Sequence, residues 1–462
     1  MLEADYLVVG AGAMGMAFTD ALMTETEATV ILVDRYPRPG GHWNHAYPFV
    51  RLHQPSSFYG VNSRPLGKDT KDTAGLNRGL YELASGPEVV SYFDHVLHQQ
   101  FLPSGRVQFF PMCDHVGGRS WRSRVSGATY QAGEGTKLVD ATYMRVTVPA
   151  MQPPRYMVAP GVRCVPVNEL ANINTPPGRY VVVGAGKTGI DACLFLLANG
   201  VDPNAIVWIM PRDAWLIDRA SVQPGSEFFE ASLGTVAAAF EVAAGASTVE
   251  ELFTNLEARG VLLRLDHAVR PTMYRCGTVT QAELLELRRI DNVIRLGRVQ
   301  RIDPDRISLQ GGTIPTSTDT LHIDCSADGL ASRPVVPVFA GDRVTLQTVR
   351  SCQQVFSAAF IGHVEAAYSS DEEKNARCTV VPHPNTALDW LRGTLANTHN
   401  AAGWRQEAPL REWLVAARLD GFTRSRAEIG TNPAHLELLA RIAEYSAPAL
   451  ANLEGLLARN DT

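Results

Sequence analysis

The residues best suited to do chemistry in this sequence begin with a glycine turn near its start. Gly10, Gly12 and Gly15 follow the apolar run YLVV and are spaced as GxGxxG. At this spacing the first glycine permits a tight turn, the second lets a pyrophosphate approach the backbone, and the third lets the next helix pack closely. That helix runs through MAFTDALM, and its N-terminal amides would face the phosphates with the positive end of the helix dipole. Ala13 and Met14 of the turn are predicted cofactor contacts.

A carboxylate follows at the end of the next apolar run, ATVILVD. Asp34 lies about 20 residues past the turn, where it can accept hydrogen bonds from both ribose hydroxyls, and Arg35 is next to it. Strand, turn, helix, strand and terminal acid in this order predict a dinucleotide-binding unit rather than a turn made only for packing. An acid at this position suits an unphosphorylated adenosine ribose, as in FAD or NAD.

The same unit occurs a second time, in YVVVGAGKTGIDACLFLLANG. Gly184, Gly186 and Gly189 repeat the spacing, and Lys187 and Thr188 in the variable positions offer an amine and a hydroxyl to phosphate oxygens. One unit holds one dinucleotide, so the sequence predicts two. A flavin that stays bound and a nicotinamide that delivers hydride and leaves would require both sites.

The second strand of this repeat, AIVWIM, is followed by PRDAWLIDR and not by an acid. Arg212 lies where a guanidinium can pair with a 2′-phosphate, which favours NADPH over NADH. Lys187, Arg212 and Arg219 are the predicted phosphate partners. The alternative is that these arginines are solvated, or paired with Asp213 or Asp218.

The segment after Asp34 distinguishes FAD from NAD as the occupant of the first unit. It is long, irregular and rich in Gly, Pro, aromatic residues, His and Arg. It resembles the GG-x-W and YPxxR elements of class B flavoprotein monooxygenases, and the matching residues are Gly40, Gly41, Trp43, Tyr47, Pro48 and Arg51. The resemblance implies that this loop runs along FAD to the isoalloxazine, with Gly41, His42, Trp43 and Arg51 as cofactor contacts.

The same resemblance indicates further candidates. His53 and Gln54, and Asn62 beyond them, occupy the region where this family places polar groups near the reactive flavin carbon. The alternative for each is a loop residue satisfied by its own backbone. The resemblance also implies backbone contacts to the adenine near Val116, and a return strand into the FAD domain that includes Ala327.

The second turn, GAGKTGIDA, resembles the element that opens the NADPH domain of flavin-containing monooxygenases. Flavin-containing and Baeyer–Villiger monooxygenases carry a histidine fingerprint just before this turn. It is absent here, because no histidine lies between His115 and His267. The best argument for ketone oxygenation is therefore lost, whereas N-hydroxylating monooxygenases share the two-unit plan without that motif.

These patterns predict an α/β protein with two Rossmann-like dinucleotide-binding domains, for FAD and NADPH, and a helical C-terminal segment. The expected parts are 1–150 (FAD domain, first part), 151–178 (proline-rich linker), 179–322 (NAD(P)H domain), 323–400 (FAD domain, second part) and 401–462 (helical segment). The helical segment is expected to cover the core or to form a dimer surface.

The predicted function is an NADPH-reduced, FAD-dependent monooxygenase. It would insert one oxygen of O2 through a flavin hydroperoxide, at nitrogen or sulfur of a small-molecule substrate. The substrate pocket is expected where the two domains meet the segment FFEASLGTVAAAF. The alternatives are an NAD(P)H-dependent FAD reductase or dehydrogenase that inserts no oxygen, and a non-catalytic flavin-binding redox sensor.

Composition argues against several other classes. A net charge of -6 provides no drive toward nucleic acid or an anionic membrane. The most apolar stretch, TVAAAFEVAAGAS, is short and carries Glu241, so no membrane span is expected. The first strand begins almost at Met1, which leaves no room for a secretory signal and favours a cytoplasmic protein.

The cysteines show no functional spacing. Seven are scattered along the chain without a CxxC motif or a Cys/His pair at metal-ligand spacing. We therefore expect neither a metal site nor a dithiol redox centre, and we expect the cysteines to be free thiols in a reducing compartment.

Overall fold

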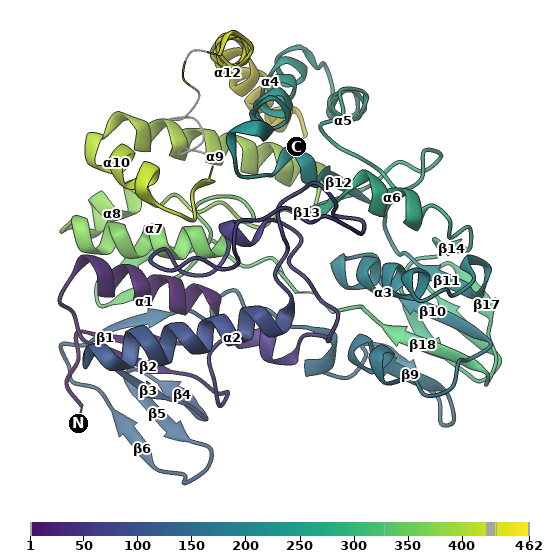
Figure 1. Ribbon diagram of the computed structural model, residues 1–462, viewed down its shortest axis with the longest axis horizontal. Coiled ribbons are helices and arrows are strands. Elements are labelled where there is room, and N and C mark those ends of the chain that lie inside the picture. The colour runs from purple at the N-terminus through teal and green to yellow at the C-terminus, as the bar shows by residue number, and fades with distance from the viewer. Residues whose placement is uncertain (1, 328, 422–429, 431, 461–462) are drawn as a thin grey trace.

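Two separate parallel β-sheets organise the chain in the computed structural model, which describes residues 2–327, 329–421, 430 and 432–460 (Figure 1). The first sheet has the strand order β19-β20-β7-β1-β2-β3, and only the β19–β20 pair is antiparallel. Its strands are β1 (Tyr6–Val9), β2 (Val30–Val33), β3 (Val107–Phe110), β7 (Lys137–Asp140), β19 (Phe339–Ala340) and β20 (Arg343–Thr345).

The second sheet is entirely parallel, in the order β14-β11-β10-β18-β9. Its strands are β9 (Arg163–Pro166), β10 (Arg179–Val183), β11 (Ile206–Ile209), β14 (Val293–Ile294) and β18 (Thr320–Asp324). Both sheets contain a central strand that runs through a glycine turn into a helix and on to the neighbouring parallel strand. The predicted α/β fold with two Rossmann-like units is confirmed.

The stretch 151–178, expected to be a linker, is part of the second domain. It contains β9, which forms the edge of the second sheet, and β8 (Met157–Val158), which joins a smaller sheet in the order β17-β16-β15-β8. Val165 of β9 is partly buried against the second core, so this stretch gains burial that a free linker would not have. After β18 the chain returns to the first sheet as β19 and β20.

Three smaller sheets complete the strands. A three-stranded sheet, β4-β5-β6, follows β3, and β12 pairs in parallel with β13. The remaining strands are β4 (Cys113–Gly117), β5 (Ser120–Ser123), β6 (Thr129–Gln131), β12 (Ala214–Asp218), β13 (Met273–Val279), β15 (Val299–Ile302), β16 (Arg306–Leu309) and β17 (Gly312–Pro315). The helices used below are α1 (Ala13–Glu25), α2 (Gly86–Val96), α3 (Lys187–Ala198), α4 (Phe229–Gly245), α5 (Val249–Ala258), α7 (Gln354–Ala367), α9 (Ala387–Gln406), α10 (Ala408–Ala416) and α12 (Pro433–Asn460).

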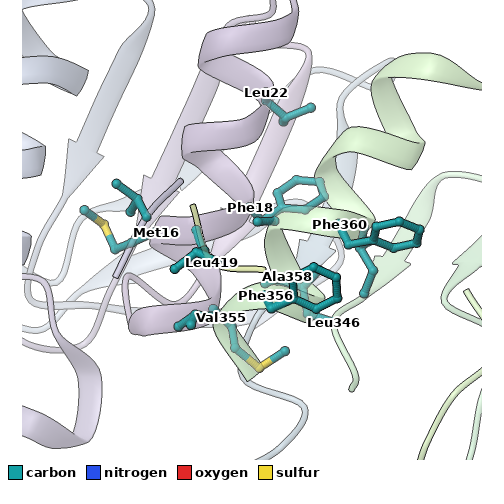
Figure 2. Packing of buried hydrophobic residues seen from close by; sticks show 14 of the residues in the cluster. Met16, Phe18, Leu22, Leu346, Val355, Phe356, Ala358, Phe360 and Leu419 are labelled. Carbon is teal, nitrogen blue, oxygen red and sulfur yellow. The ribbon is translucent and has the colours of Figure 1, made fainter. Parts of the chain in front are cut away.

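The main core lies where α1 packs on α7 (Figure 2). Phe18 of α1 and Phe356 and Phe360 of α7 are fully buried there. Gly362 allows the close approach, because a Cβ at this position would lie 2.6 Å from Cβ of Ala21. Truncating one of these phenylalanines to alanine is expected to cost about 3–5 kcal/mol. The helix that starts at the first glycine turn is thus held by a large apolar contact.

A second helical layer is formed by α4 and α12, which pack against each other at the top of Figure 1. Among the described residues, one helical stretch, Ser226–Gly245, is long and apolar enough to cross a membrane, with a mean hydropathy of 1.2. This is weak support for a span, because a core helix of a soluble protein passes the same test. Within it, Glu241 forms ion pairs with Arg259 and Arg441.

Candidate cofactor site

A cavity of about 980 Å³ opens at the carboxyl ends of the central strands of the first sheet. Gly10, Asp34 and Ala141 directly follow β1, β2 and β7, and all three line it. Ligands of open parallel sheets bind at this edge. The cavity extends to Lys187 and Thr188 at the start of α3, so one space reaches both glycine-turn units. Its volume suits a large organic ligand.

The first glycine turn is built to hold a phosphate. A Cβ on Gly15 would lie 1.9 Å from the carbonyl oxygen of Gly10, so helix α1 packs directly on the turn. No side chain caps α1 at Gly12, and the first helical residues, Ala13 and Met14, line the cavity. The amides at a helix N-terminus need acceptors, and a pyrophosphate would supply them. This turn fits the cofactor that the sequence predicts.

Asp34 is buried in the wall of the cavity. Its carboxylate accepts hydrogen bonds from the backbone N–H of Ala11 at 2.6 Å and of Tyr36 at 2.8 Å. Burial, which disfavours the charged form, raises the pKa of Asp34 above its usual value. The carboxylate ties the end of β2 to the glycine turn and borders the space where a ribose would lie, and Arg35 lines the same region.

The loop after β2 lies against the first turn. The N–H of Gly40 donates to the carbonyl of Ala11 at 2.9 Å, and the short 3-10 helix Gly41–His45 follows. The indole N–H of Trp43 donates to the hydroxyl of Tyr59 at 2.7 Å, which fixes the ring at the cavity wall. The predicted contacts on this loop all line the cavity: Gly41, His42, Trp43, Arg51, His53 and Gln54.

His53 is the most unusual of these side chains. Its ring Nδ1 is buried and has no hydrogen-bond partner among the described residues. Burial, reinforced by the positive charges of Lys187 and Arg219, lowers the pKa of His53 to about 3, so the ring is neutral near pH 7. A neutral imidazole with an unsatisfied nitrogen in a cavity is suited to hydrogen-bond a ligand. Burial also lowers the pKa of His42, to about 4.

The second turn is joined to the first domain by the loop. The hydroxyl of Tyr47 donates to the carboxylate of Asp191 at 2.6 Å, and Lys187 forms an ion pair with the same carboxylate. Phe49 stacks on Phe195 of α3 with ring centroids 4.0 Å apart. Segments from both domains therefore meet at the start of α3. No side chain caps this helix at its N-cap residue, Gly186.

The structure corrects the role predicted for Arg219. Its side chain is only 2% exposed, and its guanidinium binds both carboxylate oxygens of Glu283, each at 2.9 Å. It also donates to the carbonyl of His53 at 3.1 Å. Arg219 is therefore a buried positioning residue for the loop that carries His53, and it is not available to a 2′-phosphate. Arg212 follows β11, contacts Asn385 at 3.5 Å and remains a prediction.

Other predicted positions do not line the cavity: Asn62, Val116, Ala327, Arg212, and the glycines Gly15, Gly184, Gly186 and Gly189. The side chain of Asn62 accepts a hydrogen bond from the N–H of Leu419 at 3.3 Å, because the chain after α10 covers this loop. Val116 is 54% exposed at the end of β4, and the cavity ends one residue earlier at His115. Ala327 lies outside the lining, which the chain reaches two residues later at Gly329.

One wall of the cavity has no signal in the sequence. It is formed by β13 and by two segments, before α7 and at the start of α9, that carry no recognisable motif. The residues concerned are Tyr274, Arg275, Cys276, Ser351, Cys352, Gln353, His383, Trp390 and Asn397. Tertiary packing alone brings them together, so local spacing could not reveal them.

A side pocket of about 250 Å³ adjoins the main cavity. The two share Ile217, Val222, Tyr274 and Trp390 as walls. The far wall is helix α4, which contributes mainly apolar residues and Ser232, whose buried hydroxyl has no hydrogen-bond partner in the described part of the chain. The pocket is lined by residues of the segment FFEASLGTVAAAF, beside which a substrate pocket was expected.

The expectation that all cysteines are free thiols is wrong. Cys276 and Cys352 form a disulfide, although 76 residues separate them. That separation is why no sequence motif signals it. The free cysteines are Cys113, Cys164, Cys193, Cys325 and Cys378. Within the described residues, no group of three or more His, Cys, Asp or Glu side chains could hold a metal ion.

Comparison with solved structures finds likeness across most of the chain to flavin monooxygenases. The flavin-containing monooxygenase from Stenotrophomonas maltophilia is 14% identical, and the match covers 82% of this chain and 100% of that one, with a TM-score of 0.47. An open crystal structure of cyclohexanone monooxygenase is 13% identical over 95% of this chain and 98% of that one, with a TM-score of 0.48. The bacillithiol disulfide reductase Bdr (YpdA) from Staphylococcus aureus is 10% identical, covers 79% and 98%, and has a TM-score of 0.43.

Comparison with curated sequences gives a closer relation. No protein-family model matches the chain. The chain is 54% identical over 419 residues to the uncharacterized protein Rv2000 of Mycobacterium tuberculosis (strain ATCC 25618 / H37Rv). The match covers 91% of this chain and 78% of that protein. The uncharacterized protein Mb2023 of Mycobacterium bovis matches with the same identity and coverage. At this identity and coverage, the chain belongs to the same protein family as these mycobacterial proteins.

Proposed function

We propose that this protein is an FAD-dependent, NADPH-reduced monooxygenase that transfers one oxygen of O2 to nitrogen or sulfur of a small substrate. One observation carries the proposal. A single cavity of about 980 Å³ is lined by Gly12 and Asp34 of the first unit and by Lys187 and Thr188 of the second. Hydride can pass between two bound cofactors only if their reactive ends share one space, and this cavity provides it.

The residues of the first unit fit FAD. The uncapped start of α1 offers amides to the pyrophosphate, and Asp34 offers a carboxylate to the ribose. Trp43, fixed by Tyr59, forms a rigid wall beyond them. When bound, FAD supplies hydride acceptance from the nicotinamide and the reaction with O2.

The chain's own polar groups near the reaction are His53 and Gln54, which both line the cavity. Because the pKa of His53 is lowered to about 3, its ring stays neutral and acts as a hydrogen-bonding group and not as a cation at pH 7. Its unpartnered Nδ1 gives it capacity for one ligand atom. Arg219 holds the backbone carbonyl of His53 and so fixes the position of this loop.

The side pocket supports a small and mostly apolar substrate. Its volume of about 250 Å³ is below that of most drug-sized sites. Trp390 and Tyr274 lie between it and the main cavity, since both line the two spaces. Ser232 offers one hydrogen bond to an otherwise apolar ligand. A small amine or sulfide with an aliphatic or aromatic body has these properties.

A second candidate is an NAD(P)H-dependent FAD oxidoreductase that inserts no oxygen. The observation that favours it is the Cys276–Cys352 disulfide, which lines the same cavity and is itself an acceptor for two electrons. The two candidates share both cofactor sites and differ only in where the electrons go.

The test is product analysis under ¹⁸O2. FAD-loaded protein is supplied with NADPH and a panel of small amines and sulfides, and each product is analysed by mass spectrometry. Incorporation of one labelled oxygen per NADPH consumed supports oxygen transfer. NADPH oxidation across the panel with no labelled product excludes the monooxygenase and leaves the second candidate.

The substrate pocket is tested with a matched pair of variants on α4. Val236→Phe places a ring in the side pocket, whereas Ala231→Val changes an exposed position of the same helix. Val236→Phe is expected to reduce labelled product at least tenfold while flavin reduction by NADPH stays within twofold of wild type. Equal loss in both variants, or in neither, contradicts the assignment of this pocket.

A further inference from the structure

The Cys276–Cys352 disulfide lies on the cofactor cavity and joins two parts of the chain. Cys276 is in β13, which pairs with β12 beyond the second glycine-turn unit. Cys352 is in the segment between β20 of the first sheet and α7. Both line the cavity that reaches the two glycine-turn units. The disulfide therefore lies in the same cavity in which the proposed hydride transfer between the cofactors would take place.

We propose that Cys276–Cys352 is a redox-active disulfide, reduced to a dithiol by the dihydronicotinamide or dihydroflavin held in the same cavity. This inference rests on the proposed function for its electron donor. It concerns a second redox centre, made of the chain's own side chains, beside the cofactors.

Both cysteines of the pair line the cavity, and among the free cysteines of the described residues only Cys113 also does. Cys352 is partly exposed and Cys276 is 9% exposed at the cavity wall. Burial raises the pKa of Cys164 to about 11, and it raises the pKa values of Cys193 and Cys325 well above the usual thiol value. Those thiols therefore stay protonated and unreactive.

The backbone at both cysteines is in a conformation that L-residues rarely adopt. The φ angle is +54° at Cys276 and +61° at Cys352, and only three other non-glycine residues in the described ranges have positive φ. Left-handed residues other than glycine cost free energy and gather at functional sites. A disulfide with only a structural role does not require a left-handed backbone at both of its cysteines.

The surroundings of Cys352 suit thiol chemistry. The Nδ1 atom of His383 lies 3.9 Å from the Cys352 sulfur, and the hydroxyl of Ser351 lies 3.5 Å from it. An imidazole at this position can take the proton of the thiol formed at Cys352, and the thiolate is the reactive form. His383 is thus the proposed base of the pair.

The reduction balances as a two-electron step. The S–S bond takes up two electrons and two protons and breaks into two thiols. A dihydronicotinamide provides the electrons and one proton as hydride and is oxidised, and solvent provides the second proton. Opening the bond also removes the covalent tie between β13 and the segment before α7.

The experiment counts thiols in the FAD-loaded protein without oxygen. The protein is mixed with NADPH and quenched with acid and maleimide under denaturing conditions. The number of labels is then read from the mass of the intact protein by mass spectrometry. Before reduction the five free cysteines should react. After NADPH all seven should react, and peptide mapping should place the two new labels on Cys276 and Cys352.

Four variants test the assignment, three through the thiol count and one through its pH dependence. Cys164→Ser removes a free thiol far from the disulfide in sequence and should keep the rise of two. Cys276→Ser and Cys352→Ser should show no rise with NADPH. In the reduced protein, His383→Asn should move the pH at which Cys352 reacts with maleimide upward by about one unit or more, which a purely structural histidine would not do. The wild-type mapping stands if a serine variant fails to fold.

The outcomes separate this inference from the proposed function. Bleaching of the flavin by NADPH with no new thiols overturns the redox-active disulfide and leaves the proposed function standing. Seven reactive thiols in the protein as isolated, without reductant, also overturn it. If NADPH does not bleach the flavin, the proposed function fails, and photoreduced FAD replaces NADPH: two new thiols then support the disulfide's role, and none overturns it.

Discussion

The two glycine turns have the same internal packing but different coverings. In the first, a Cβ on Gly15 would lie 1.9 Å from the carbonyl oxygen of Gly10. In the second, a Cβ on Gly189 would lie 2.1 Å from the carbonyl oxygen of Gly184. The third glycine of each turn therefore has one purpose, which is to let the helix close on the strand.

The second glycines differ. A Cβ on Gly12 would meet Gly41 at 3.7 Å, whereas a Cβ on Gly186 would meet nothing within 4 Å. The loop Gly41–His45 covers the first turn, whereas the corresponding glycine of the second, Gly186, is exposed. A covered turn fits a cofactor that stays bound, and an open turn fits one that arrives and leaves. The same glycine spacing is thus compatible with different roles, because the segments that follow the two turns differ.

The largest expected effects come from the glycines that the turns share. Gly15→Ala should give protein without flavin colour and with a free energy of unfolding lower by about 3 kcal/mol, because its methyl group overlaps a backbone oxygen. Gly189→Ala should be destabilised alike at the second turn. Flavin absorbance and urea unfolding measure both. Gly135→Ala, where a Cβ meets nothing within 4 Å, is the control, and a yellow Gly15→Ala protein of wild-type stability contradicts the packing argument.

The next effect separates the two sites without disturbing the fold. Gly12→Ala should weaken FAD binding at least tenfold, about 1.4 kcal/mol, because the methyl group occupies the approach of the pyrophosphate. Gly186→Ala should retain FAD and weaken only NADPH binding, also by about tenfold. Calorimetric titration of each cofactor gives both affinities. Loss of FAD affinity in Gly186→Ala would show that the second turn does not hold a separate cofactor.

A smaller effect is expected from pH, through His53 in the long segment after β2. The pKa of His53 is lowered to about 3 in the folded protein, whereas the unfolded chain takes up this proton near pH 6.5. Between these values the unfolded state binds more protons, so the free energy of unfolding should fall as pH is lowered. From pH 7 to pH 5 the loss should be roughly 1–2 kcal/mol.

His53→Gln checks this assignment. The variant removes the titrating ring, so its stability should depend less on pH in that window, while His42, with a pKa lowered to about 4, still contributes in the same direction. Urea unfolding at pH 7 and pH 5 provides the comparison. Equal pH dependence in wild type and variant would mean that His53 is not buried neutral.

Local sequence patterns predicted those parts of the site whose residues are close together in the sequence. Strand, turn, helix and terminal acid lie within a few tens of residues, so the spacing of residues alone could assign Gly12 and Asp34 to one region. The loop at Trp43 was added by its resemblance to a family motif. The buried pairing of Arg219 with Glu283 could not be assigned in this way, since a surface arginine and a core arginine look alike in one sequence. The same holds for Cys276 and Cys352, which only tertiary packing brings together.

The smallest expected effect concerns the choice of nicotinamide at the open turn. Arg212 follows β11, where the sequence predicts a contact to the 2′-phosphate of NADPH, and its guanidinium also reaches Asn385. Because a single charge pair near the surface contributes about 1 kcal/mol, Arg212→Ala should reduce the preference for NADPH over NADH about fivefold. The measurement is kcat/KM for both coenzymes, with Arg298→Ala, an exposed arginine of the same domain, as control. If the preference for NADPH over NADH is unchanged in Arg212→Ala, this residue does not bind the 2′-phosphate. The open turn would then select its ligand through Lys187 and Thr188 alone.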